Sequence, residues 1–325
     1  MVKFSVVVPF FEEQGNIIPL HKKIVASMKK LGSFEIIYIN DGSKDNTLQE
    51  LLTIKEENVR VFNLKKNYGQ STAMDLGFRK AKGDFIVTLD GDLQNDPSDI
   101  PKLYKKLIDD DLDVVAGYRK KRKDPVWMLF VTRVARFLRG LLVSDGVKDS
   151  GCTLRIYKKE AVKDLELWGE MHRYIIALLG WQGAKIGEIA VRHNPRIRGK
   201  TKYSWKKSFK GLVDLVYIWF WKKFSARPLH LFGIAGLFVG FLGFLSGLWT
   251  IKLKLVNNVS LSDSAWLPLS GFLLLAGLQL FTTGIIFDLL IRTYYNTSKV
   301  QNRYNIKEEY VAGKKVNFSH ENNHN

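Results

Sequence analysis

The sequence predicts an α/β domain followed by two helices long enough to span a membrane. Over the first 115 residues, apolar β-rich runs alternate with segments of helical periodicity, and acidic residues cluster where those runs end. Near the C-terminus, two long stretches almost lack charge. The 325 residues suffice for one large domain with an appendage, or for two domains.

The composition narrows the class of partner. The formal charge of +18 indicates a polyanionic partner, which is nucleic acid, anionic lipid or a phosphorylated substrate. The single cysteine, Cys152, excludes an internal disulfide framework and a cysteine-based zinc site. No signal peptide is expected, because the apolar start of the chain is short and breaks at Pro9.

Five short runs rich in β-branched and aromatic residues predict strands. They are KFSVVVP (3–9), FEIIYIN (34–40), VRVFNL (59–64), DFIVTLD (84–90) and LDVVAG (112–117). Four segments between them have apolar residues at helical spacing, at 15–31, 46–57, 71–82 and 98–110. Such near-continuous apolar strands, alternating with helices, favour a parallel sheet covered on both faces, with ligands at the carboxyl ends of its strands.

The stretch TLDGDLQNDP (88–97) places Asp90 and Asp92 where a predicted strand ends. Carboxylates this close repel each other, so a bound cation is the simplest reason for the pair. Mg²⁺ and Mn²⁺ take oxygen ligands and commonly bridge carboxylates to substrate phosphates. The alternative is an ordinary acidic loop.

The second half of the chain is more basic and less regular. The segments 126–143 and 204–224 combine aromatic and apolar residues with Arg or Lys, which is typical of helices that lie in the membrane interface. The alternative for each is an ordinary surface helix. The polar tail, 292–325, is expected to be disordered, at least from about residue 296.

The segments 229–251 and 265–291 predict two transmembrane helices, because about 20 apolar residues span a bilayer and the only charge in either is Asp288. The alternative is a buried helical hairpin in a soluble core. Positive residues precede the first span and follow the second: Lys222, Lys223, Arg227, Arg292, Lys299 and Arg303. The positive-inside rule therefore predicts cytoplasmic termini and an external loop at 252–264.

Four motifs follow one another at consecutive predicted strand ends: VVVPFFEEQGNI (6–17), NDGSKDNT (40–47), NYGQSTAMDLGFRKAKGD (67–84) and LDGDLQNDP (89–97). In this order they resemble family 2 glycosyltransferases of the GT-A fold. The membrane-linked part is similar to the branch that contains dolichol-phosphate mannose synthase and bactoprenol glucosyltransferases. The resemblance extends to about residue 291 and implies a GT-A domain, interfacial helices and two C-terminal transmembrane helices.

The resemblance also implies roles for particular residues. The residues implied to bind the nucleotide sugar are Pro9, Glu13, Asp41, Asn67, Asp90, Gln94, Arg198 and Lys202. The residues implied to bind the metal ion, Mg²⁺ or Mn²⁺, are Asp90, Asp92 and Gln94. Three positions depart from the family pattern: Phe11 replaces a Tyr, Glu12 an Asn, and Asn40 the first acid of D-D-G-S.

The later motifs VAGYR, DSGCTLRIYKK and GEMHRYI, with the predicted helix that follows GYR, supply further candidates. The resemblance implies lipid-phosphate binding by Arg119, Arg133, His172 and Arg173, and catalytic roles for Asp92, Asp149 and Glu170. A lipid monophosphate already carries a nucleophilic oxygen, because its second pKa is about 6 by analogy with phosphoserine. A strong protein base is therefore dispensable, and direct attack would invert the anomeric carbon.

Together these observations predict a cytoplasmic GT-A domain (1–203), juxtamembrane helices (204–228), two spans and a cytoplasmic tail. The predicted reaction is metal-dependent, inverting transfer of a sugar, with UDP-hexose favoured, to undecaprenyl or dolichyl phosphate for cell-envelope glycan or protein glycosylation. One alternative is a processive synthase of the same fold, whose Q-x-x-R-W motif is absent. Another is a non-catalytic basic membrane adaptor. Membrane lipid is an expected partner, nucleic acid is not, and homo-oligomerisation stays open.

Overall fold

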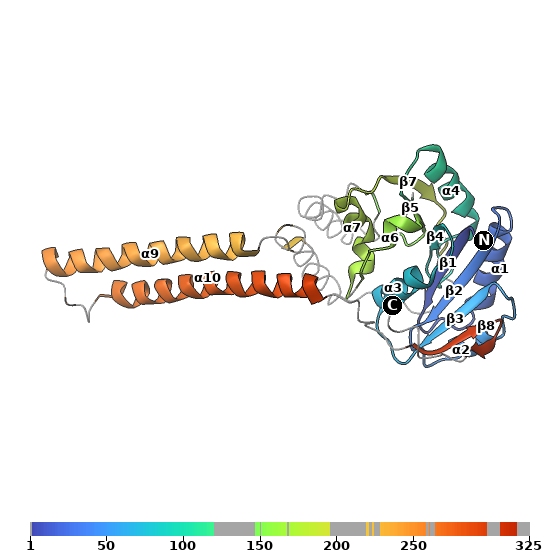
Figure 1. Cartoon of the computed structure of the whole chain (residues 1–325), viewed down its shortest axis with the longest axis horizontal. Coiled ribbons are helices and arrows are strands. Elements are labelled where there is room, and N and C mark those ends of the chain that lie inside the picture. Colours follow the sequence, from blue (N-terminus) through green and yellow to red (C-terminus); the bar gives the residue numbers. More distant parts are fainter. Residues whose placement is uncertain are drawn as a thin grey trace. The chain divides into compact units, whose positions relative to one another are not determined.

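The chain folds into two compact units (Figure 1), one formed by Met1–Asp214 with Asn302–Asn325 and the other by Leu215–Gln301. The computed structural model describes residues 2–119, 147–149, 151–167, 169–195, 219–220, 223, 228–257, 260, 264–297 and 306–316. The two predicted interfacial segments, 126–143 and 204–224, lie outside the described residues except for 219, 220 and 223.

The first unit is built on a mixed sheet whose described strands run in the order β7-β5-β6-β4-β1-β2-β3-β8-β9. Its centre, β4-β1-β2-β3, is parallel, and antiparallel pairing adds β6 on one side and β8 on the other. The strands are β1 (Phe4–Phe10), β2 (Phe34–Asn40), β3 (Val59–Leu64), β4 (Phe85–Thr88), β5 (Val114–Arg119), β6 (Arg155–Lys158), β7 (Ile186–Val191), β8 (Ile306–Val311) and β9 (Lys314–Val316). The predicted α/β fold and its five strands are confirmed.

The first four α-helices form where the sequence has helical periodicity, and further short helices follow in the described part of the first unit. They are α1 (Ile17–Met28), α2 (Thr47–Leu52), α3 (Gln70–Lys80), η1 (Pro97–Asp99), α4 (Ile100–Asp109), α6 (Lys159–Val162), η2 (Met171–Tyr174) and α7 (Ile175–Trp181). On α1, Ile17, Leu20 and Ile24 recur at helical spacing and are fully buried. They join one core with the inward side chains of β1 and β2, and this burial fixes the strands whose ends carry the polar motifs.

The C-terminal tail contradicts the prediction of disorder. Residues 306–316 form the hairpin β8–β9, and β8 pairs antiparallel with β3 (Figure 1). The prediction is wrong there because the order comes from pairing with a distant strand edge, which a polar segment does not reveal in its own sequence. Arg60 on β3 secures the pairing through an ion pair of 3.1 Å with Glu309.

The second unit contains two long helices, α9 (Pro228–Asn257) and α10 (Trp266–Thr297), which run side by side (Figure 1). Both are long and apolar enough to cross a membrane. They approach closely through glycines: a Cβ at Gly236 would lie 2.6 Å from the Gly277 carbonyl oxygen, and one at Gly277 would lie 2.6 Å from the Gly240 nitrogen.

The outward faces of these helices favour lipid over the alternative of a buried soluble hairpin. Only 22% and 11% of the two most apolar windows are buried, and large side chains such as Phe238 are 62% exposed. The predicted span 229–251 lies within α9, and 265–291 lies within α10 except for its first residue, but α9 continues to Asn257 and α10 to Thr297. The predicted loop 252–264 therefore starts too early, because a helix with two lysines can extend beyond the apolar stretch.

Candidate active site

The polar motifs meet at the carboxyl edge of the parallel strands. Phe10 on β1 is in register with Asn40 on β2, and Asn40 with Asn63 on β3. Val7 on β1 is in register with Thr88, the last residue of β4. The loops after these strands therefore leave the sheet at one edge, as the sequence predicts, and Asp41 and Asp90 lie there.

Asp90 follows β4 in surroundings that disfavour its charge. Gln70 Nε2, at the start of α3, donates to its carboxylate at 2.7 Å, and Thr153 also hydrogen-bonds it. Removal from water, and then the neighbouring charge of Asp92, raise the pKa of Asp90 to about 6. The nearby Arg155 guanidinium acts in the opposite direction.

Asp92 completes the pair in a tight turn. It is 7% exposed, and its Oδ1 accepts the backbone N–H of Gln94 at 3.1 Å. Leu93 between them has a φ of +62°, which an L residue rarely adopts and which folds Gln94 back toward Asp92. Gly91 packs so closely that a Cβ would lie 2.5 Å from the Phe10 ring. The turn between the two carboxylates is therefore fixed by packing as well as by hydrogen bonds.

The donor set fits a hard divalent cation. Among the described residues, no group of three or more His, Cys, Asp or Glu is placed to hold a metal ion by itself. Two neighbouring carboxylates, of which Asp90 has its pKa raised by burial and by Asp92, lie beside the partly exposed Gln94. This set suits an ion that takes its other oxygen ligands from a substrate. Such an ion would supply charge neutralisation for a diphosphate.

Asp41 has a structural task that the resemblance did not imply. Its two carboxylate oxygens accept the backbone N–H groups of Tyr68 at 2.7 Å and Gly69 at 2.9 Å. Burial raises its pKa, while these two donors lower it. Gly42, with a φ of +67°, lies against the Lys66–Asn67 peptide, so close that a Cβ would be 2.3 Å from the Lys66 carbonyl carbon. The loops after β2 and β3 are thus locked together.

The other nucleotide candidates lie on the same edge with different exposure. Pro9 is partly exposed near the end of β1. Glu13 accepts from Asn16 Nδ2 at 2.6 Å, and its backbone N–H donates to Thr47 Oγ1 at 3.0 Å. Asn67 is exposed in the loop after β3.

Arg119 and Asp149, predicted in separate roles, are bonded to each other. Arg119 Nε and Nη2 donate to the two carboxylate oxygens of Asp149 at 2.6 Å and 2.8 Å. This is a bidentate pair, in which the side chains are only 16% and 8% exposed. One edge of the guanidinium is therefore used within the protein, and the pair ties the end of β5 to the segment before Cys152.

His172 is held as a neutral side chain. Its Nδ1 lies 2.9 Å from Ser71 Oγ, and its backbone N–H donates to the same oxygen at 2.9 Å. Burial, and then the charges of Arg173 and Arg155, lower its pKa to about 3. An uncharged imidazole brings no positive charge to a phosphate, so the predicted lipid-phosphate role of His172 would depend on hydrogen bonding. Arg173 and Glu170 form a 3.0 Å ion pair with each other, and both are about half exposed.

Sequence reasoning missed the residues that connect these motifs. Gln70 and Ser71 open α3, one bonded to Asp90 and the other to His172. Arg155 on β6 is 2% exposed, donates to the Cys152 carbonyl at 2.8 Å and lies close enough to lower the pKa of Asp90. The available signal was an arginine between Leu154 and Ile156 in the motif DSGCTLRIYKK. Three predicted cations, Arg133, Arg198 and Lys202, lie outside the described residues.

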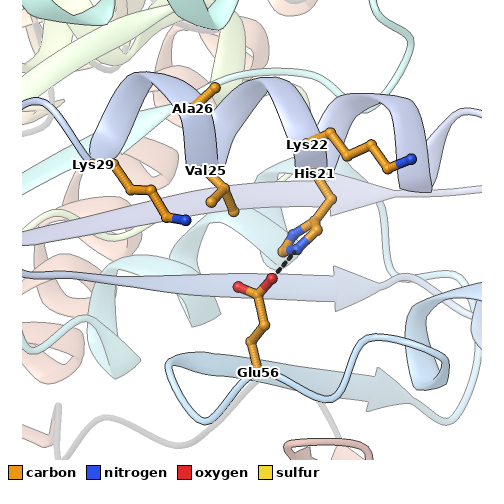
Figure 2. A pocket seen from close by; sticks show the side chains of 6 residues that line it. All are labelled: His21, Lys22, Val25, Ala26, Lys29 and Glu56. Carbon is orange, nitrogen blue, oxygen red and sulfur yellow. Dashed lines mark hydrogen bonds and ion pairs between the residues drawn. The ribbon is translucent and has the colours of Figure 1, made fainter.

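Two surface hollows in the described part of the chain are lined by residues away from this edge. One hollow, of about 340 Å³, lies beside α1 and is lined by His21, Lys22, Val25, Ala26, Lys29 and Glu56. Figure 2 shows His21 facing Glu56, at 3.0 Å, and its other ring nitrogen lies 2.9 Å from Tyr38. A second hollow, of about 470 Å³, involves Lys106 and Glu188. Neither is lined by Asp90 or Asp92.

The fold and the strand-end motifs define a glycosyltransferase. The family model described as Glycosyl transferase family 2 matches residues 5–166. The chain belongs to this family, and two relatives carry polyprenyl phosphates in their names. It is 36% identical over 301 residues to dodecaprenyl-phosphate galacturonate synthase of Rhizobium johnstonii, covering 90% of this chain and 89% of the relative.

Further comparisons agree with this assignment. The chain is 30% identical to undecaprenyl-phosphate 4-deoxy-4-formamido-L-arabinose transferase of Pseudomonas paraeruginosa, covering 89% of this chain and 85% of the relative. The fold is similar to glucosyl-3-phosphoglycerate synthase of Mycobacterium tuberculosis in complex with Mn²⁺, UDP and glucosyl-3-phosphoglycerate. That likeness has a TM-score of 0.51 and 17% identity, over 68% of this chain and 80% of the other. It confirms the predicted GT-A fold.

Proposed function

We propose that this protein transfers one sugar from a nucleotide sugar to a polyprenyl phosphate. The observation that carries the proposal is the pair Asp90 and Asp92 at the carboxyl edge of the sheet, where Asp90 has a pKa raised to about 6. Two adjacent carboxylates, one of them with its ionised form disfavoured, suit a cation bridging to a diphosphate. The relatives named for polyprenyl-phosphate sugar transfer, which match about nine-tenths of the chain, support the acceptor.

The donor is proposed to be a UDP-sugar, with Mg²⁺ or Mn²⁺. Support comes from the neighbour of the same fold that was crystallised with Mn²⁺ and UDP. For the sugar, the relatives' names point to a uronate or a formamido-arabinose, and a hexuronate is the first to test because the relative at 36% identity is a galacturonate synthase. Asp90, Asp92 and Gln94 would hold the metal, which when bound neutralises charge on the departing diphosphate.

The acceptor supplies its own nucleophile. A phosphate oxygen of the lipid attacks the anomeric carbon, the bond from that carbon to the UDP oxygen breaks, and UDP leaves with the bonding electrons. No strong base is needed, because the phosphate is largely ionised at neutral pH. Arg119 and Arg173 are the proposed phosphate ligands among the described residues, with Arg133 as a further candidate from the sequence. Attack in line with the leaving group inverts the anomeric carbon.

Both chain termini are proposed to lie in the cytoplasm. The hairpin after α10 belongs to the same sheet as the N-terminal strand, which requires an even number of crossings between them. Two apolar helices satisfy this requirement, and the flanking Lys and Arg residues set the direction.

The test is a panel of donors with one acceptor. Purified protein in detergent is incubated with undecaprenyl phosphate, MnCl₂ and, in separate reactions, UDP-galacturonate, UDP-glucose and UDP-formamido-arabinose, and the lipids are analysed by mass. The proposal expects one donor to give a product heavier by one sugar, and Asp92→Asn to give none. A ladder of sugars would indicate the processive alternative, and no product from any nucleotide sugar in a wider panel would contradict the proposal.

A further inference from the structure

A continuous set of hydrogen bonds runs from the C-terminal hairpin into the strand-end loops. Glu308 on β8 accepts from Asn63 Nδ2 at 3.3 Å, and Asn63 Oδ1 accepts from Asn40 Nδ2 at 2.8 Å. Asn40 Oδ1 then accepts the backbone N–H of Ser43 at 3.3 Å. Ser43 Oγ in turn accepts the backbone N–H of Glu12 at 3.0 Å. This relay, Glu308–Asn63–Asn40–Ser43, links the last strands of the chain to the loops after β2 and β1.

The direction of the relay is fixed at both ends. The Glu308 carboxylate only accepts, so Asn63 must turn its amide nitrogen toward it and its oxygen toward Asn40. At the other end, the Ser43 backbone N–H only donates, so Asn40 must turn its oxygen toward Ser43. Asn40 and Asn63 are 2% and 5% exposed, which leaves little access for water to replace either bond.

The hairpin that carries Glu308 is itself firmly attached. Arg60 on β3 bonds Glu309 and also Glu35 on the neighbouring strand, at 3.1 Å and 3.4 Å. Glu308 also accepts from Lys315 Nζ at 3.0 Å and Tyr310 Oη at 2.8 Å, and these donors lower its pKa to about 2. A fixed, ionised acceptor therefore stands at the start of the relay at every physiological pH.

We propose that the β8–β9 hairpin positions the donor site, with Glu308 acting through Asn63 and Asn40 as a positioning residue for the loop that begins at Asp41. The inference rests on the proposed nucleotide-sugar donor. It assigns the tail a task in donor binding, beyond its place after the membrane helices. The same loop holds the β1 loop through further bonds, from Gln14 N–H to Asp45 at 3.3 Å and from Glu13 N–H to Thr47 at 3.0 Å.

This proposal also explains why an asparagine stands at position 40. An aspartate there would only accept, and Asn63 would have to turn its nitrogen toward it and its oxygen toward the Glu308 carboxylate. Two acceptors would then face each other in a buried place, which costs free energy. An asparagine at position 40 is therefore the residue that Glu308 requires. The departure from D-D-G-S at this position is explained by the acidic residue on the hairpin.

The experiment reverses the relay. Asn40→Asp in the full chain should raise the KM for the nucleotide sugar about tenfold, with little change in the KM for undecaprenyl phosphate. Adding Glu308→Gln should bring the donor KM back to within about threefold of wild type. The glutamine amide can donate to Asn63 and Asn63 to the aspartate at position 40, so both side-chain bonds run the other way, while the Ser43 N–H still donates to residue 40. Glu308→Gln alone keeps an acceptor for Asn63 and should stay within about twofold.

The matched control is Glu309→Gln in the Asn40→Asp background. It removes the same charge from the adjacent residue but breaks only the Arg60 pair, so it should not restore the donor KM. Equal rescue by the two glutamine variants would reduce the effect to general electrostatics and overturn the proposal. A wild-type donor KM in Asn40→Asp would overturn it as well.

A ligand-free measurement separates this inference from the proposed function. Hydrogen exchange of peptides covering residues 40–47 should quicken in Asn40→Asp and slow again when Glu308→Gln is added, whether or not the donor is a nucleotide sugar. If wild type turns over no nucleotide sugar, the proposed function fails. The exchange pattern still tests whether the relay from Glu308 holds the loop at residues 40–47. Unchanged exchange in Asn40→Asp would refute the positioning role even in an active enzyme.

Discussion

Replacing Asp90 by asparagine should abolish transfer and yet stabilise the metal-free protein. The pKa of Asp90 rises from 3.8 to about 6, so in the fold its ionised form is disfavoured relative to the unfolded chain. At about 1.36 kcal/mol per pKa unit, the two units correspond to at most about 3 kcal/mol at neutral pH. Asn keeps the oxygen that accepts from Gln70 and removes the charge, so a gain of about 1–3 kcal/mol is expected.

The stability gained by Asp90→Asn should depend on pH in a defined direction. Below about pH 4, Asp90 is protonated in both states and its charge costs nothing, while above about pH 6 it is ionised in the fold and the full cost applies. The advantage of Asp90→Asn should therefore be largest at pH 7.5 and shrink toward pH 4.5. The assay is chemical denaturation in detergent with EDTA at both values, alongside transfer assays with MnCl₂.

The control is Asp96→Asn, in the same motif. Asp96 accepts the N–H of Ser98 at 3.0 Å and has a lowered pKa, so this substitution should reduce stability at pH 7.5. If Asp90→Asn is no more stable than wild type at pH 7.5 in EDTA while Asp96→Asn loses stability, the reasoning about the carboxylate pair is refuted.

Three further predictions follow from the same geometry. UDP with MnCl₂ should raise the melting temperature of wild type at pH 7.5 but much less at pH 5, because protons compete for Asp90 below about pH 6; equal shifts would count against a metal at this carboxylate. A cysteine at Ser260 should react with impermeant reagents outside intact cells, while a cysteine at Ser43 should not. The native Cys152 is buried and should give a low background. Labelling of both introduced cysteines would contradict the two-span topology. His172→Asn should lower stability by about 1–3 kcal/mol at pH 8 through loss of the partly buried bond to Ser71. This loss should shrink below about pH 6.5, because there the unfolded imidazole of wild type binds a proton that the folded one excludes; a loss that grows toward pH 5 would show a charged histidine in the fold.

The central strands were predictable because each is a local signal. A run such as FEIIYIN can only be buried on both faces, and the acidic pair after FIVTL is conspicuous at the end of such a run. The position of Asp90 and Asp92 at the sheet edge follows from parallel topology alone, and the structure has them there.

The contacts that complete the site have no local signal. His172 meets Ser71 across 101 positions of sequence, and Asn63 meets Glu308 across 245. The hairpin β8–β9 owes its order to the edge of β3, so its polar sequence resembled a disordered tail. The mutual pairing of Arg119 with Asp149 could not be foreseen either, because each residue alone fitted a ligand-binding role.

The central claim, a single transfer to a lipid phosphate, is tested most directly by the structure of the lipid product. The measurement is the mass and the anomeric configuration, by NMR, of the product formed from undecaprenyl phosphate and the best α-linked UDP-sugar of the panel. The predicted result is one sugar joined through a phosphodiester in the β configuration, with UDP released in equal amount. A product with an α linkage, or sugar released to water or polymer without any sugar-bearing lipid, would contradict it.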